Sequence, residues 1–211
     1  MKNRVIKLFL LFLSMFVISG CVSVKKEPLD NIVSYVIGNN RKIYNNSNRG
    51  YKYYIPRGLS AQSVDNLNVI IKNDKYKYYL YVDLVSFYNK TEMNYKEDKS
   101  LYYSKSIRNN EGIINVTKLA EGYLVNVQYN YAKIEVIVAE KDIKETVCNA
   151  LIIVSSVDYN ENAIKAMLDE GILSTKERVV EVFKNPGNRN DLLETDDVYE
   201  DDENVDVDYI N

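Results

Sequence analysis

The side chains that most often carry out catalysis are scarce in this chain. Its 211 residues include no His and only two cysteines, Cys21 and Cys148. Histidine is the usual general base near neutral pH and a common metal ligand, and a Ser or Cys nucleophile needs a base within reach. Cys148 stands among apolar residues of a predicted helix, where we expect a thiol that fills the core. We therefore expect a protein that is not an enzyme, with no cofactor and no metal site.

The other cysteine, Cys21, follows a leader that is first positively charged and then apolar. Three basic residues stand within the first seven positions, and an apolar run occupies residues 8–17. A helix over this run and the next three residues is about 20 Å long at about 1.5 Å per residue, too short for a hydrocarbon core of about 30 Å. The segment therefore predicts a secretory signal over residues 1–20 and not a membrane-spanning helix.

The end of this leader, Ile18-Ser19-Gly20-Cys21, resembles the lipobox of bacterial lipoproteins, in which an aliphatic and two small residues precede a cysteine. The resemblance implies that the Cys21 thiol carries diacylglycerol and that a peptidase cuts between Gly20 and Cys21. Two acyl chains, palmitate for example, anchor a protein stably where one is marginal. The protein is then held on the extracytoplasmic face of the cell membrane. The alternative is an ordinary signal peptide in which Cys21 stands by chance.

Charge divides the remainder of the chain. The formal net charge is −3, but residues 191–211 hold ten Asp or Glu and no Lys or Arg. A segment so acidic and poor in apolar residues predicts disorder. The expected organisation is a signal peptide over 1–20, a lipidated tether over 21–28, an α+β domain over 29–187 and an acidic, disordered tail over 188–211.

Alternation of side-chain types predicts strands in the first part of the domain. The strongest pattern covers residues 76–87, with Tyr76 and Tyr78 on one face of the strand and Tyr79 and Tyr81 on the other. A short helix is expected before the strands, and an antiparallel meander after them, with turns at Glu121-Gly122 and Asn130-Tyr131. The expected ranges are 29–37 for the helix, 51–55, 68–71, 76–87 and 101–107 for single strands, and 113–118, 123–130 and 132–139 for the meander.

Helices are expected after the meander. Asp142 with Glu145 forms a capping-box-like start, and the apolar residues that follow fall on one stripe. Further helices are expected over 161–169 and from Ser174. The fold class is therefore α+β, a mostly antiparallel sheet covered on one face by the amphipathic helix that starts near Asp142. The residues expected on the stripe are Ile143, Val147, Ala150, Leu151 and Val154.

Two features resemble the PsbP-like superfamily, which includes DcrB-type bacterial lipoproteins. The first is Tyr53-Tyr54-Ile55-Pro56-Arg57-Gly58-Leu59, a strand that enters a Pro-x-Gly turn; the second is the late amphipathic helix over 142–157. The resemblance covers residues 51–157 and implies an α/β/α-like sandwich used for binding or assembly, usually without catalysis. A Trp often follows that Gly in the family, where this chain has Leu59, and the resemblance transfers no site residues.

Tyrosine is the most unusual residue of the chain, with 19 copies, many of them beside Lys or Arg. Aromatic and basic residues together bind nucleic acid by stacking and phosphate contacts, or sugars and anionic wall polymers, but Tyr is also a favoured strand residue. Export argues against nucleic acid as a partner. The leading hypothesis is a non-enzymatic binding or envelope-assembly module, with a receptor for a wall polymer or small ligand as the alternative and a hydrolase third. The expected partners are the membrane, through lipid on Cys21, and an envelope protein or wall polymer; the candidate binding surface is Tyr76, Tyr78, Tyr79 and Tyr81.

Overall fold

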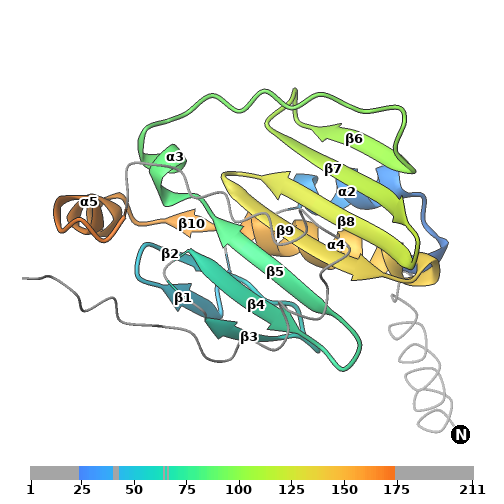
Figure 1. The fold of residues 1–211 in the computed structure, drawn as a ribbon, viewed down its shortest axis with the longest axis horizontal. Coiled ribbons are helices and arrows are strands. Elements are labelled where there is room, and N and C mark those ends of the chain that lie inside the picture. Colours follow the sequence, from blue (N-terminus) through green and yellow to red (C-terminus); the bar gives the residue numbers. More distant parts are fainter. Residues whose placement is uncertain (1–23, 40–42, 64, 66, 174–211) are drawn as a thin grey trace, which may run out of the picture. The chain divides into compact units, whose positions relative to one another are not determined.

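The computed structural model describes residues 24–39, 43–63, 65 and 67–173 (Figure 1). These residues belong to one compact unit of the chain. The predicted signal peptide, the helix expected from Ser174 and the acidic tail lie outside the described residues.

The main element is a seven-stranded antiparallel sheet with the strand order β3-β4-β5-β9-β8-β7-β6. Its centre is the predicted meander, in which strands β7, β8 and β9 follow one another and pair in register. Strand β5 joins the free edge of β9, so the meander and the earlier strands form one sheet. The strands are β3 (Ser60–Ser63), β4 (Asn68–Lys72), β5 (Lys77–Val82), β6 (Tyr103–Ile107), β7 (Gly112–Leu119), β8 (Gly122–Tyr129) and β9 (Ala132–Val138).

Tight turns fix the register of the meander. Asn130 and Tyr131 link β8 to β9 and both have positive φ, 53° and 57°, as a two-residue type I′ hairpin turn requires. Gly122 opens β8 with φ +97°, and a Cβ at this position would lie 2.8 Å from the carbonyl oxygen of Val138. Glycine is therefore required there, for its backbone angle and for the close approach of β9.

Two helices cover one face of the sheet, the far face in Figure 1. Helix α4 (Ile143–Ser156) contacts β8 and β9, and helix α2 (Leu29–Gly38) packs against α4. The predicted stripe of α4 is confirmed, because all five of its residues are at most 3% exposed. The short 3-10 turn η1 (Val24–Lys26), expected as part of the tether, also contacts α4. The α+β class, with helices packed on an antiparallel sheet, is confirmed.

A second, three-stranded sheet joins segments that are distant in sequence. Strand β2 (Tyr51–Tyr53) lies between β1 (Asn46–Asn48) and β10 (Asp158–Tyr159). Tyr51 and Tyr53 are buried, as their alternation with Lys52 predicts, and burial raises the pKa of Tyr53 to about 12. Helix α5 (Glu161–Asp169) begins at the cap Asn160, whose side chain accepts a bond from the amide of Ala163.

Two local expectations were wrong. The strand predicted to run to residue 87 ends at Val82, and Leu84–Tyr88 forms the short helix α3. The Asp83 carboxylate accepts a 2.8 Å hydrogen bond from the amide of Ser86, which starts a helix where alternation alone suggests a strand. At the second position, Asp142 does not cap α4 with its side chain. It lies in the 3-10 turn η2 (Glu140–Asp142) and accepts a hydrogen bond from the Tyr76 hydroxyl.

Candidate binding surface

The predicted lipidation site lies just ahead of the described chain. Gly20 and Cys21 are outside the described residues, which start three positions after the cysteine, at Val24. Within the part of the chain that is described, no helix is long and apolar enough to cross a membrane.

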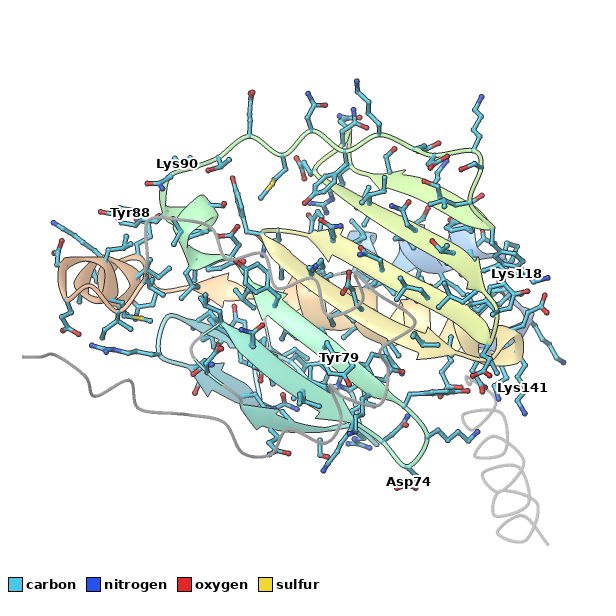
Figure 2. The ribbon with its side chains drawn as sticks, in the orientation of Figure 1. Asp74, Tyr79, Tyr88, Lys90, Lys118 and Lys141 are labelled. Carbon is cyan, nitrogen blue, oxygen red and sulfur yellow. The ribbon has the colours of Figure 1, made fainter. Side chains whose placement is uncertain are left out.

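The four tyrosines of the candidate surface do not lie together. Tyr78 is 1% exposed and points into the core with Leu80 and Val82. Tyr79 and Tyr81 alternate with it, so they lie on the opposite face of the sheet and are half-buried there. Figure 2 shows Tyr79 near the middle of this face, which is turned toward the viewer. Tyr76 lies in the β4–β5 turn. Of the four, Tyr79 and Tyr81 therefore belong to the face opposite α2 and α4, here called the open face.

Tyr79 belongs to a row of side chains that crosses all seven strands of the open face. Residues that are directly opposite in an antiparallel pair share a face, and the registers link Tyr79 to Ile70 on one side and to Glu135 on the other. Six of the seven members have a side chain that can form hydrogen bonds, and one of these, Glu135, is buried. In strand order the members are Gln62, Ile70, Tyr79, Glu135, Asn126, Asn115 and Ser104.

The centre of the row is an ordered polar network. The Glu135 Oε1 atom lies 3.3 Å from the Lys133 Nζ atom and accepts a 2.8 Å hydrogen bond from Asn126 Nδ2. Gln128 Nε2 donates to Asn126 Oδ1 at 3.0 Å. The side chains of Lys133 and Glu135 are only 13% and 9% exposed. The network holds its side chains in fixed positions, and Tyr79, with a pKa raised by burial, packs beside it as a neutral phenol.

Tyr76 connects the β4–β5 turn to the start of α4. Its hydroxyl donates to Asp142 Oδ2 at 2.8 Å and accepts from the amide of Ala139 at 3.3 Å. The hydrogen bond from Tyr76 favours the ionised carboxylate and holds the pKa of Asp142 below its ordinary value. The role of Tyr76 in the fold is thus to join two segments at the end of the sheet.

Replacing Tyr76 by Phe tests this joint. A carboxylate with a depressed folded-state pKa stabilises the fold above its unfolded pKa of about 4, and this contribution is lost as the pH falls through the folded value. We therefore expect Tyr76→Phe to lower the Tm by about 3 °C at pH 7, with a smaller difference from wild type at pH 3. Tyr35, which is 71% exposed, gives the control Tyr35→Phe. Thermal unfolding followed by circular dichroism measures both, and an equal Tyr76→Phe deficit at the two pH values contradicts the assignment.

The free thiol and the acidic side chains are the remaining groups that could take part in nucleophilic chemistry or metal binding. Cys148 is free and half-buried against the core, and burial raises the pKa of its thiol, which disfavours the reactive thiolate. Among the described residues, no group of three or more His, Cys, Asp or Glu is placed to hold a metal ion.

A hollow of about 480 Å³ lies between α2 and the edge strand β6. Its rim carries Asp30, Lys105 and Arg108. Two of these groups already have partners in the chain: Asp30 accepts a 2.8 Å bond from the Tyr103 hydroxyl, and Arg108 donates to the carbonyl of Ile37 at 3.0 Å. The hollow therefore presents fewer groups for a ligand than its charged rim suggests.

A comparison with models of protein families, with curated proteins and with solved structures finds no match for this chain. The resemblances to lipoproteins and to the PsbP-like superfamily therefore stay predictions.

Sequence reasoning missed the polar half of the open face. Asn115, Asn126, Gln128, Lys133 and Glu135 were not singled out, although each sits at an alternate position of a predicted strand. The signal was present in the two-residue turns, because a tight hairpin turn sets which residues face each other.

Proposed function

We propose that this chain is a lipid-anchored protein of the extracytoplasmic face of the cell membrane. Its folded domain would be a non-enzymatic module that binds an envelope protein. The anchor is supported by the lipobox-like Ile18-Ser19-Gly20-Cys21 at the end of a short apolar leader. One observation carries the binding role: the partly exposed Tyr79 and Tyr81 lie on the sheet face opposite the helices, beside a polar network whose positions are fixed.

The chemistry of this face favours a protein partner. Tyrosine is enriched at protein interfaces because its ring contributes large apolar area with little loss of conformational freedom, while its hydroxyl can form hydrogen bonds. The polar network beside the rings has its side chains already ordered, which reduces the entropy lost on binding.

Site-specific photo-crosslinking in the native host tests the binding face. A photo-reactive residue is placed at position 79, at position 81 or, as the control, at position 35 on α2, where the native Tyr is 71% exposed. We expect one discrete adduct from positions 79 and 81 that is absent from position 35. Adducts of the same pattern and yield from all three positions, or none from the sheet, speak against the open face as the binding surface.

The anchor is tested by removing the thiol that would carry the lipid. In a lipoprotein-competent bacterium, we expect Cys21→Ser to move the protein from the membrane fraction to the soluble fraction, since no acyl chain can then be attached. The matched control is Cys148→Ser, which removes the other thiol of the chain and should leave the protein with the membrane. Fractionation with immunoblotting measures both, and a Cys21→Ser protein that stays bound to membranes rules out the lipid as the anchor.

A wall polymer is the second candidate ligand, favoured by the partly exposed carboxamide groups of Asn115 and Asn126, which are opposite each other on β7 and β8. These groups match the hydroxyl groups of a glycan as donors and acceptors. In that case, purified wall fragments raise the Tm of the protein, and Asn126→Ala abolishes the increase.

A further inference from the structure

The start of the described chain lies against the first turn of α4. Lys144 Nζ donates to the carbonyl of Lys25 at 3.3 Å, and Lys25 Nζ lies 3.9 Å from Glu145 Oε2. The side chain of Val24 packs, partly buried, against the core. The position of Val24 is thus fixed relative to α4, and any anchor attached a few residues earlier is confined to this end of the domain.

The distance from Val24 to the anchor is short. Cys21 precedes Val24 by three residues, and three residues of fully extended chain reach about 11 Å. Strand β8, with eight residues, spans roughly 27 Å at about 3.4 Å per residue. The reach of the tether is therefore smaller than the separation of the two ends of the sheet, so a lipid on Cys21 decides which end lies near the bilayer.

Several turns gather at this end. Ala139 and Asp142 bond to Tyr76 of the β4–β5 turn, and Tyr123, at the start of β8, pairs with Val138 at the end of β9. In Figure 2, Asp74, Lys118 and Lys141 lie toward this end, while Tyr88 and Lys90 lie at the other. We call the β4–β5 turn, the β7–β8 turn and residues 139–145 the turn end.

Three lysines cluster at the turn end, and their hairpin contains too few acidic residues to balance their charge. Lys72 and Lys77 are directly opposite each other on β4 and β5, and both are exposed, as is Lys75 between them. Like charges at opposed positions repel. The acids beside them are Asp74, in the same hairpin, and Asp142, whose carboxylate attracts Lys75. An anionic surface close to the three ammonium groups relieves this repulsion. Electrostatic attraction between lysines and anionic lipids is best known at the cytoplasmic leaflet, but it acts at any leaflet that contains anionic lipids.

We propose that the turn end rests on the bilayer and that Lys72, Lys75 and Lys77 contact anionic phospholipid headgroups. The inference depends on the proposed lipid anchor at Cys21. The strands then stand upright on the membrane, the end of the sheet near α3 points away from it, and the open face is turned sideways, where a partner in the envelope can reach it.

Energy transfer to labelled lipids tests the orientation. The lipidated mature protein, in a Cys148→Ala background, is reconstituted into vesicles of phosphatidylcholine with one third phosphatidylglycerol that contain a headgroup acceptor. A donor dye is attached at Asp74→Cys or Lys118→Cys for the turn end, and at Tyr88→Cys or Lys90→Cys for the other end. We expect severalfold stronger donor quenching at positions 74 and 118. Equal quenching at both ends, or stronger quenching at 88 and 90, overturns the orientation.

A second arm tests the headgroup contact. The Lys72→Gln/Lys75→Gln/Lys77→Gln variant should lose part of the quenching at position 118, and vesicles of phosphatidylcholine alone should have the same effect on the wild type. Lys90→Gln/Lys96→Gln, with lysines outside the turn end, is the matched control and should quench as the wild type does. If the quenching at position 118 is unchanged both in the three-lysine variant and in vesicles of phosphatidylcholine alone, the contact with anionic headgroups is overturned.

Mass spectrometry of the reconstituted protein separates the two proposals: an unmodified Cys21 refutes the anchor itself, whereas a lipidated Cys21 with the wrong quenching pattern refutes only the orientation.

Discussion

Glu135→Ala is expected to lower the free energy of unfolding by about 3 kcal/mol, although Glu135 lies on the sheet face opposite the helices. Its side chain is 9% exposed, and its carboxylate is the partner of the ammonium group of Lys133, whose side chain is 13% exposed. Removing the carboxylate leaves a largely buried charge without its partner, and it also removes the acceptor for Asn126 Nδ2. Both losses leave desolvated polar groups unsatisfied.

The double variant Lys133→Met/Glu135→Leu distinguishes the net contribution of the ion pair to stability from the cost of leaving one charge without its partner. Replacing a buried ion pair by apolar residues of similar size is often neutral or stabilising, so we expect a stability within about 1 kcal/mol of the wild type. The matched control is Glu170→Ala, which breaks the exposed Arg49–Glu170 pair, whose side chains are 45% and 52% exposed, and should cost less than about 1 kcal/mol. Urea unfolding followed by circular dichroism measures all three. A loss for Glu135→Ala as small as that for Glu170→Ala means that water screens the Lys133–Glu135 pair.

If the double variant is as stable as the wild type, the fold does not need the charged pair. The polar network then serves a purpose other than stability. An apolar residue at these positions would add apolar area beside the partly exposed Tyr79 and Ile70, and larger apolar surfaces favour association with other chains. A polar network keeps the face soluble and fixes hydrogen-bonding groups for a partner. The same double variant therefore tests the proposed function: it should fold, and it should fail to give the crosslinked adduct at position 79.

The central part of the sheet was predictable because its order depends on short-range signals. Turns at Glu121-Gly122 and Asn130-Tyr131 separate three alternating segments, and adjacent antiparallel segments joined by tight turns pair with each other. The structure has these three strands as neighbours. The pairing of Asn126 with Glu135 follows from the Asn130-Tyr131 turn by counting along the strands. The first turn lies one residue earlier than expected, at Ala120-Glu121, and it is this position that sets Asn115 opposite Asn126.

The rest of the fold depends on long-range contacts that no local pattern contains. Strand β10 has two residues, and it pairs with β2 more than a hundred positions earlier. Helix α3 begins at Leu84 within an apolar run that fits a strand equally well by alternation, and its cap Asp83 decides the outcome. In α4, the predicted stripe left out Ile153, which is 0% exposed, because the arrangement of α2 and β2 around the helix was not predictable from α4 itself.

The packing of α4 gives the second large expected effect. Leu151 is 0% exposed and belongs to the hydrophobic core. Truncation of a fully buried Leu removes its transfer free energy and leaves a cavity that the surroundings fill only in part. We therefore expect Leu151→Ala to lower the free energy of unfolding by about 3–4 kcal/mol, measured as a lower urea midpoint at an unchanged slope.

The neighbouring Ile152 provides the control, because it is only partly buried against the same core. Ile152→Ala should cost clearly less, about 1–2 kcal/mol. Equal losses for the two variants would mean that α4 does not present distinct faces to the sheet and to solvent, contrary to the structure.

A loss of stability confined to Leu151→Ala has a further consequence for the anchored protein. Helix α4 also holds Val24–Lys26 through Lys144 and Glu145, so loosening the packing of α4 should weaken the link between the sheet and the anchor. In the lipidated protein, Leu151→Ala should then reduce the difference in quenching between positions 74 and 90, while Ile152→Ala should leave most of it in place.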